Sequence, residues 1–217
     1  MPDALHLQAV AKRYGTGPFI FRDLTHTFTP GTTTGLVGPN GSGKTTLLRL
    51  LSAEAFPTSG RVALGSLEVH TAPYQYLQQV GIVHDGAQLP AYLSATEVLE
   101  TILRARGQWD AKRSPMDIDA LLDALLLDER REQLIGTYSS GMFKKAQMAA
   151  ALIADPQVLL LDEPFRGLDT DSTAAALAYL AEFKQRGGIT ILSSHLQPSL
   201  QALTDDLIRF PIATEDA

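Results

Sequence analysis

A glycine-rich stretch between an apolar and a leucine-rich segment is the part of the sequence best suited to chemistry. It fits the pattern G-x4-G-K-S/T and comprises Gly38, Pro39, Asn40, Gly41, Ser42, Gly43, Lys44 and Thr45, with Thr46 directly after it. Glycines let backbone N–H groups converge on phosphate oxygens, and the start of the following helix adds its positive dipole end. Lys44 places a charge on the outer phosphates, the Thr45 hydroxyl ligates Mg²⁺, and Thr46 also reaches the phosphates. The stretch therefore predicts a phosphate-binding loop.

Two acidic residues follow a second apolar segment, 158–161. A buried strand of this kind delivers Asp162 and Glu163 to the carboxyl edge of a sheet, where ligands bind in α/β folds. We expect Asp162 to hold Mg²⁺, directly or through water, and Glu163 to orient and polarise an attacking water. Taken alone, the pair is explained equally well as a strand end followed by an acidic helix cap. Beside a phosphate-binding loop, the catalytic interpretation is favoured.

Strands and helices at suitable places can position these groups. Segment 32–37 is β-branched and apolar and runs directly into the glycine-rich stretch, and 44–53 has the leucine spacing of a helix. Short apolar runs at 158–161 and 189–192 are typical of buried parallel strands, with a helix predicted between them at about 172–186. The carboxyl ends of such strands meet at one sheet edge.

The other segments indicate a β-rich start and a helical insertion. Leu5, Leu7 and Ala9 alternate with polar residues, as in a half-buried strand. The stretch 89–153 is mostly helical in its pattern, and Ser114 before a proline suits a helix N-cap. Together the segments predict an α/β core interrupted by helices.

Charge and composition exclude several classes of function. The 217 residues carry a net charge of −6, whereas a sequence-independent nucleic-acid binder is usually basic, so we expect no nucleic-acid partner. The absence of cysteine removes disulfides, thiolate metal sites and a cysteine nucleophile. We expect no signal peptide, because the N-terminus has neither a basic region nor an apolar run, and no membrane span, because no apolar run approaches the ~18–20 residues that a span requires. Any membrane span must then come from another chain.

A third motif resembles a motif of a known protein family. Tyr138, Ser139, Ser140, Gly141 and Met142 stand between the two motifs described above. In this order the sequence resembles, over nearly its whole length, the ATPase domain of ABC proteins, whose LSGGQ signature has this place. By themselves the two serines are equally well explained as helix N-caps. The resemblance implies that Ser139, Ser140 and Gly141 contact the γ-phosphate of ATP.

Three further segments match the family in the same order. Tyr14 stands where the family's aromatic ring stacks on adenine, an interaction that discriminates bases poorly, so GTP can also bind. Asp169 belongs to a segment, 167–169, that resembles the D-loop and is expected at the nucleotide. His195 follows an apolar strand, as the family's switch histidine does. Alternatively, Tyr14 is an aromatic residue of a turn without a ligand, and His195 is a surface or core histidine whose hydrogen bonds are made within the protein.

The sequence departs from the family pattern after segment 80–83. The family has a glutamine there that ligates Mg²⁺ and senses the transport partner, whereas this chain has Asp85, with Gln88 three residues later. A carboxylate also coordinates Mg²⁺, so we expect Asp85 to be a metal ligand with altered coupling. The signature departs as well, because the usual Leu, second Gly and Gln are replaced by Tyr138, Ser140 and Met142.

The resemblance implies a mechanism shared by two ATPase subunits. Each ATP is expected between Lys44 of one subunit and Ser139 and Gly141 of the other, so that two ATP and two Mg²⁺ complete a head-to-tail dimer. Glu163 is then the base, while Lys44, Mg²⁺ and His195 stabilise the phosphoryl charge. One chain fills every catalytic role, which favours a homodimer, or a heterodimer in which this chain carries the competent residues.

The family also suggests what the ATPase drives. We expect the ATP-binding and hydrolysing subunit of an ABC transporter that powers a separate transmembrane permease, with export favoured. It would be cytoplasmic and peripheral on the cytoplasmic face of the membrane. Segment 85–97, with Pro90, Tyr92 and Leu93 exposed, would form the groove for the permease, although packing within the subdomain explains these residues equally well. A soluble ABC ATPase that acts in assembly of a macromolecular complex is the alternative.

The expected architecture follows from the same resemblance. The fold class is α/β, a P-loop NTPase (RecA-like) core with an N-terminal antiparallel β subdomain and an inserted α-helical subdomain. Residues 1–217 are expected to form a single ABC ATPase domain. Within it, 1–88 and 154–217 form the catalytic core with the β subdomain, and 89–153 form the helical subdomain that carries the signature.

Overall fold

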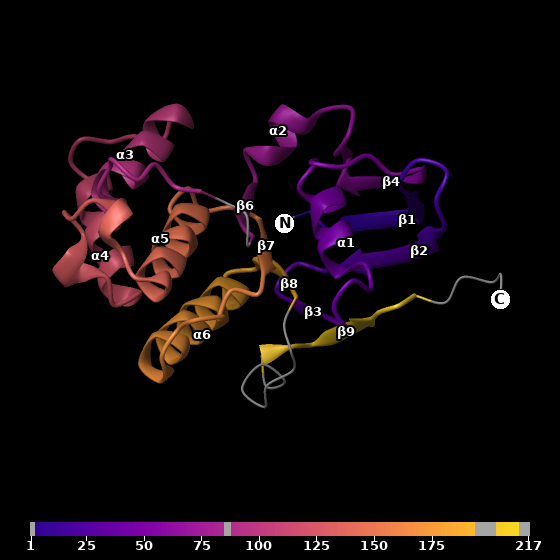
Figure 1. Cartoon of the computed structure of the whole chain (residues 1–217). Coiled ribbons are helices and arrows are strands. Elements are labelled where there is room, and N and C mark those ends of the chain that lie inside the picture. The colour runs from indigo at the N-terminus through magenta and orange to yellow at the C-terminus, as the bar shows by residue number, and fades with distance from the viewer. Residues whose placement is uncertain (1–2, 85–87, 194–202, 213–217) are drawn as a thin grey trace.

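Two sheets and a group of helices make up the part of the chain that the computed structural model describes, residues 3–84, 88–193 and 203–212. In Figure 1 most helices gather at one end of the molecule, the antiparallel sheet stands at the other end, and the parallel sheet lies between them. This mixture of a parallel sheet, an antiparallel sheet and helices confirms the α/β class.

The first sheet is antiparallel and has the strand order β2-β1-β4-β5. Its strands are β1 (Leu5–Arg13), β2 (Phe19–Phe28), β4 (Ser59–Leu64) and β5 (Leu67–Glu68). All four come from the first third of the chain. The antiparallel sheet expected at the N-terminus is therefore present.

The predicted alternation along β1 is wrong at Ala9. Leu5 and Leu7 are buried, but Ala9 is exposed and Val10 takes the next buried place. Ala9 has a φ of 47°, and the register against β2 shifts between Leu7 and Val10, which marks a β-bulge. Gly60 on β4 accommodates the bulge, because a Cβ there would lie 2.3 Å from the Ala9 carbonyl oxygen. A bulge inserts one residue and so breaks a period of two.

The second sheet is parallel and has the strand order β6-β7-β8-β3-β9. Its strands are β3 (Thr33–Val37), β6 (Val80–Val83), β7 (Val158–Asp162), β8 (Ile189–Ser193) and β9 (Asp206–Arg209). Every residue of β3, β7 and β8 is buried, as the uninterrupted apolar runs predicted. Because β8 pairs with both β3 and β7, the ends of these strands meet at one edge of the sheet.

The helices are spread along the chain between these strands. They are α1 (Lys44–Leu51), α2 (Pro73–Leu77), α3 (Ala95–Ala105), α4 (Ser114–Ala124), α5 (Ser140–Leu152) and α6 (Thr170–Gln185), with the short 3₁₀ helices η1 (Asp128–Arg130) and η2 (Ile135–Thr137). Ser114 is the first residue of α4 and not its N-cap, because its hydroxyl accepts the Asp110 N–H at 2.9 Å and Arg113 takes the cap position. Within the described residues no helix has the length and apolar character to cross a membrane.

The parallel sheet separates two hydrophobic cores. Val158 and Leu160 on β7 pack in one core with α1 and the antiparallel sheet, whereas the intervening leucines of β7 pack in the other with α3, α4, α5 and α6. Helix α5 approaches β6 so closely that a Cβ at Gly81 would lie 2.1 Å from the Ala151 carbonyl oxygen. The helix that begins in the signature segment is therefore seated directly on the sheet that carries the acidic strand.

Candidate functional site

The glycine-rich segment 38–43 links β3 to α1, where the sequence predicted it. Gly38 and Gly43 have φ values of 152° and 114°. A Cβ at Gly38 would lie 2.4 Å from the Phe210 carbonyl oxygen, and one at Gly43 would lie 2.6 Å from Cγ2 of Ile20. Both positions therefore need glycine for backbone conformation and for space. The chain thereby brings backbone groups close to the start of α1 without side chains in the way.

Groups suited to phosphate surround the start of α1. Gly43 is the N-cap and offers no side-chain hydrogen bond to the first turn, whose N–H groups suit an anion. The Ser42 hydroxyl is buried and has no hydrogen-bond partner among the described residues. Lys44 is 7% exposed, and its Nζ donates to the carbonyl oxygens of Gly38 and Pro39 at 2.7 and 2.9 Å. This combination fits a bound polyphosphate.

Thr45 and Asp162 meet where α1 lies against β7. The Thr45 hydroxyl donates to Oδ2 of Asp162 at 2.9 Å, and Asp162 is 6% exposed. A hydroxyl and a carboxylate are the hard oxygen donors that Mg²⁺ takes together with waters and substrate phosphates. In residues 3–84, 88–193 and 203–212, no group of three or more His, Asp or Glu could hold a metal. The pair therefore suits a metal that is shared with a phosphate.

Glu163 follows β7 in a left-handed backbone conformation, with a φ of 48°. This conformation costs a residue other than glycine about 1–3 kcal/mol, so its surroundings must hold it. The Glu163 N–H donates to the Ser193 carbonyl oxygen at 3.1 Å and to the Ser193 hydroxyl oxygen at 3.2 Å. The Ser193 hydroxyl in turn donates to Oδ1 of Asp162. One serine at the end of β8 thus contacts both predicted acidic residues.

The signature segment forms the start of α5. Ser139 is the N-cap, and its Oγ accepts the Met142 N–H at 3.3 Å, while Ser140 is the first helical residue. The capping interpretation of Ser139 is therefore confirmed, and the phosphate contact stays a prediction. Gly141 packs against backbone, because a Cβ there would lie 2.9 Å from the Gly167 carbonyl oxygen. The signature thus contacts the segment that follows the acidic strand.

Two more predicted site residues lie at the edges of this region. Asp169 is the N-cap of α6, and its Oδ1 accepts the Ser172 N–H at 2.7 Å, which lowers the pKa of the Asp169 carboxyl below its ordinary value. Tyr14 lies between β1 and β2 with 51% of its surface exposed, and Nζ of Lys12 lies 4.5 Å from the ring centre. An exposed ring held by a cation offers a stacking surface. Both interpretations of Tyr14 stay open.

Two predicted residues, Asp85 and His195, lie outside the described residues. At the carboxyl edge of the parallel sheet, hydrogen bonds link Thr45, which follows Lys44 in the chain, to Asp162 and, through Ser193, to the Glu163 backbone. The signature residues lie at the start of α5, in contact with the segment before α6.

Residues 21–166 match the family profile described as ABC transporter. The chain belongs to the ABC transporter family. It is 30% identical to the ABC transporter ATP-binding protein NatA of Bacillus subtilis, over 86% of this chain and 76% of that protein. It is 31% identical to the doxorubicin resistance ATP-binding protein DrrA of Mycobacterium tuberculosis, over 94% of this chain but only 62% of that protein. It is also 31% identical to the manganese transport system ATP-binding protein MntA of Synechocystis, over 94% of this chain and 80% of that protein.

Solved structures of ABC proteins share the fold of this chain. One, described as the structure of the ATP binding subunit of an ABC transporter, superposes with a TM-score of 0.87 at 24% identity, over 95% of this chain and 85% of that one. Another, a nucleotide-free ATP-binding cassette from an ABC transporter, gives a TM-score of 0.80 at 18% identity, over 96% and 87% of the two chains. The P-loop ATPase fold expected from the resemblance is confirmed.

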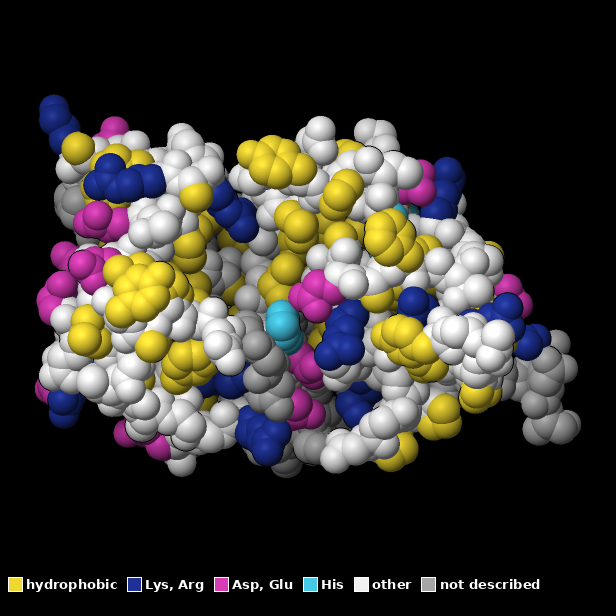
Figure 2. Space-filling view, turned by 45° about the horizontal axis from the view of Figure 1, so that its top comes forward, with side chains coloured by type: hydrophobic (Ala, Val, Ile, Leu, Met, Phe, Trp, Pro, Cys, Tyr) yellow, Lys and Arg dark blue, Asp and Glu magenta, His cyan; other side chains and the backbone are white. Residues whose placement is uncertain are grey.

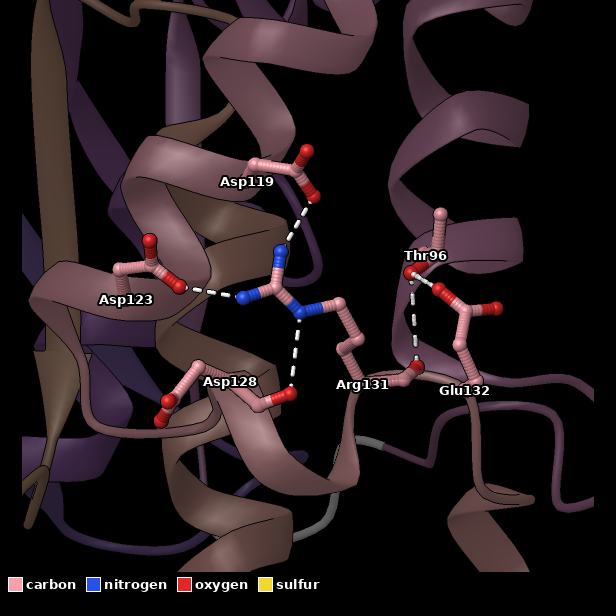
Figure 3. A network of polar contacts seen from close by, with 6 residues as sticks. All are labelled: Thr96, Asp119, Asp123, Asp128, Arg131 and Glu132. Atoms are coloured by element: carbon pink, nitrogen blue, oxygen red, sulfur yellow. Dashed lines mark hydrogen bonds and ion pairs between the residues drawn. The ribbon is translucent and has the colours of Figure 1, made fainter.

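A polar network in this ABC chain holds the segment that leads into the signature (Figure 3). At its centre, the Arg131 guanidinium binds the carboxylates of Asp119 and Asp123 on α4 and the carbonyl oxygen of Asp128. Thr96, in the first turn of α3, donates to Oε1 of Glu132 at 2.7 Å. These contacts tie α3 and α4 to the chain before Tyr138. The sequence offered no signal for them, because each partner is an ordinary surface residue until the fold is known.

A groove of about 530 Å³ lies between α2 and β6 on one side and α3 and α5 on the other. Tyr74, Leu89, Ile102 and Arg106 are among the residues that line it, and Tyr74 is 71% exposed. In Figure 2 hydrophobic side chains gather on both sides of a hollow between the helical end of the molecule and the rest. One of the lining residues, Leu89, belongs to segment 85–97, which the sequence predicted to form a groove for the permease.

The prediction that Pro90, Tyr92 and Leu93 are all exposed is only partly correct. Tyr92 is 76% exposed, whereas Pro90 and Leu93 are half-buried. The reason is a pair of backbone hydrogen bonds: Ile135 donates to the Leu93 carbonyl oxygen at 2.8 Å, and Gly136 donates to that of Ala91 at 2.9 Å. The segment therefore lies against the chain that leads into the signature.

Proposed function

We propose that this chain is the ATP-binding and hydrolysing subunit of an ABC transporter and that it powers a separate transmembrane permease. The observation that carries the proposal is the set of hydrogen bonds that links Thr45 to Asp162 and, through Ser193, to the Glu163 backbone next to the phosphate loop. In this proposal Thr45 and Asp162 are the metal-binding pair, and Glu163 is the base that acts beside the phosphate loop. Family membership supports ATP as the nucleotide.

The chemistry proposed for these residues is hydrolysis of the β–γ phosphoanhydride. Lys44 and the N–H groups of the loop hold the outer phosphates, and Thr45 and Asp162 hold Mg²⁺, which when bound neutralises phosphate charge. Glu163 orients the water and takes its proton as the water oxygen bonds to the γ-phosphorus. The bond from the γ-phosphorus to the bridging oxygen breaks, and ADP and phosphate are released. His195 is proposed to contact the γ-phosphate, and Asp85 to be a further Mg²⁺ ligand.

A second ATPase subunit is part of the proposal, with a homodimer favoured. The phosphate loop leads into α1, and the signature forms the start of α5. These two helices pack in different cores, on the two sides of the parallel sheet. Ser139, Ser140 and Gly141 of one subunit would then contact the ATP held by Lys44 of the other. Tyr14 would stack on the adenine, and Asp169 would lie near the nucleotide. ATP binding closes the dimer, and loss of the γ-phosphate lets it open.

The permease is proposed to dock in the groove between α2 and α3. Its walls are largely apolar, and Tyr74 projects from one of them, as expected of a surface that receives a partner helix. The hydrogen bonds of Ile135 and Gly136 join the loop that follows Leu89, a lining residue of the groove, to the chain that leads into the signature. The chain would then sit on the cytoplasmic face of the membrane, with 89–153 as the helical subdomain between permease and nucleotide, and 1–88 and 154–217 as the catalytic core.

Export is the proposed direction of transport. The relatives include a doxorubicin resistance ATP-binding protein and the Nod factor export ATP-binding protein I of Burkholderia orbicola, which is 31% identical over 91% of this chain. The chain spans 62% and 64% of those two proteins. A manganese transport protein is similarly related, and the proposal rests on the Nod factor export and doxorubicin resistance proteins.

The purified chain is expected to release phosphate from ATP only when Mg²⁺ is present, and its rate per chain should rise with protein concentration as dimers form. Phosphate release would be measured with Mg²⁺ and with EDTA, alongside light scattering for the oligomeric state. Absence of Mg²⁺-dependent release would contradict hydrolysis. A chain that stays monomeric by light scattering yet turns over at a constant rate per chain would contradict the shared site.

A further inference from the structure

We propose that Ser193 is a positioning residue for ATP hydrolysis, which fixes the Glu163 backbone and the Asp162 carboxylate relative to each other. This inference rests on the proposed function of the site. Ser193 touches neither phosphate nor water in the proposal, and it acts through the two acidic residues that do the chemistry.

The first support is the place of Ser193 in the sheet. It is the last residue of β8, it is 0% exposed, and it lies opposite Asp162 in the parallel register of β7 and β8. The four residues of β8 before it are apolar or β-branched, as befits a buried strand. Its hydroxyl is therefore delivered to the carboxyl edge of the sheet, directly beside the end of the acidic strand.

The second support is the strained backbone of Glu163. A φ of 48° is uncommon for glutamate, and the N–H at this turn donates to two acceptors, both of which belong to Ser193. The carbonyl oxygen would remain after any substitution, whereas the hydroxyl oxygen would not. Loss of the hydroxyl weakens the restraint at the residue whose side chain must aim at the water, and small displacements of a catalytic group are costly.

The third support is that the two carboxylate oxygens of Asp162 accept hydrogen bonds from two different hydroxyl groups. Oδ1 accepts from the Ser193 hydroxyl, and Oδ2 accepts from the Thr45 hydroxyl at 2.9 Å. The carboxylate thereby accepts from β8 through one oxygen and from α1 through the other. Without the serine, a nearly buried carboxylate loses one of the two donors that the described residues supply to it and can rotate away from Thr45.

A buried serine can also be purely structural, and Thr190 provides the matched control. Thr190 lies on the same strand, it is 0% exposed, and its hydroxyl has no hydrogen-bond partner among the described residues. Thr190→Val therefore removes a buried hydroxyl from β8 without touching Asp162 or Glu163. The change in kcat caused by Thr190→Val shows how far turnover depends on a buried hydroxyl of β8 that contacts neither acidic residue.

The test compares steady-state hydrolysis in Ser193→Ala, Ser193→Thr and Thr190→Val. We expect kcat to fall about 10–100-fold in Ser193→Ala with little change in the KM for ATP, because positioning and not ground-state binding is lost. Ser193→Thr, which retains the hydroxyl, should regain most of the turnover. Thr190→Val should keep a kcat close to that of the natural chain.

A second measurement does not depend on turnover. Binding of a fluorescent ATP analogue would be followed with EDTA and during a Mg²⁺ titration. We expect Ser193→Ala to bind the analogue normally in EDTA but to need several-fold more Mg²⁺ for half of the metal-dependent signal, since Asp162 is held less well. A normal Mg²⁺ response would contradict the role assigned to the Asp162 contact.

The outcomes separate this inference from the proposed function. No Mg²⁺-dependent phosphate release by the natural chain would remove the proposed function itself. An active natural chain and an inactive Glu163→Gln, together with an unchanged kcat in Ser193→Ala, would overturn only the role of Ser193. An equal loss of kcat in Thr190→Val would do the same. If Ser193→Ala does not fold, Ser193→Cys replaces it, and a folded cysteine variant with the natural kcat overturns the inference.

Discussion

Glu163→Gln is expected to bind ATP as the natural chain does while its turnover falls about 1000-fold, within the range ascribed to general bases. The amide has the size of the carboxylate but cannot accept the proton of the attacking water. Substitution leaves the backbone hydrogen bonds from residue 163 to Ser193 and the Thr45–Asp162 contact in place. Phosphate release would give the rate, and size-exclusion chromatography with ATP should show an accumulated dimer.

Glu54→Gln is the matched control for this variant. Glu54 lines a cavity of about 300 Å³ that Thr45 and Asp162 also line, and it pairs with His84 at 3.1 Å. Because this exposed pair contributes little, turnover in Glu54→Gln should stay within about twofold of the natural chain. Near-normal turnover in Glu163→Gln, or an equal loss in Glu54→Gln, would overturn the assignment of Glu163 as the base.

Lys44→Ala is expected to weaken ATP binding about 10–100-fold, the equivalent of one or two charge-assisted hydrogen bonds. The ammonium is nearly buried against the loop carbonyls, so its loss removes both a phosphate contact and a support of the loop. Calorimetry with a non-hydrolysable ATP analogue would give the affinity. The melting temperature should be measured in parallel, because two carbonyl oxygens lose their donor.

The control for the lysine is Arg49→Ala. Arg49 is an exposed cation in the last turn of α1, the same helix that Lys44 begins. Arg49→Ala removes one positive charge, as Lys44→Ala does, but should leave ATP affinity within about twofold, since Arg49 lies more than one helical turn beyond Lys44 and has no proposed phosphate contact. Unchanged affinity in Lys44→Ala, or the same loss in Arg49→Ala, would count against phosphate binding by the loop.

Local patterns with a fixed physical reason predicted much of the site. The glycine loop lies between β3 and α1 because only that arrangement opens backbone N–H groups to a phosphate, and Asp162 ends a fully buried strand as its apolar run indicated. Each pattern predicted one Mg²⁺ ligand, Thr45 or Asp162, and the structure shows a hydrogen bond between these two residues. The α/β class could also be predicted, since buried parallel strands and helices have different periods.

Other features depend on contacts between distant parts of the chain. The bulge at Ala9 needs Gly60 opposite it, and neither residue reveals the other in the sequence. The role of Ser193 depends on the pairing of β7 with β8, which brings it opposite Asp162. The signal in the sequence was that Ser193 is a polar residue at the end of an apolar run, like the run that ends in Asp162. The φ of Glu163 had no sequence signal, because the strain is imposed by the turn and by Ser193.

A transporter subunit must bind a membrane partner, and co-purification tests that binding most directly. Tagged Glu163→Gln would be isolated from solubilised native membranes with and without ATP, and its partners identified by mass spectrometry. Tyr74→Glu, in the groove, and Phe56→Glu, at an exposed aromatic that does not line it, form the matched pair in the same background.

We expect a polytopic membrane protein in stoichiometric amount, retained by Phe56→Glu and lost from Tyr74→Glu. Recovery of a soluble partner, or of the chain alone, would contradict the transporter assignment and favour an ATPase that acts in assembly of a complex.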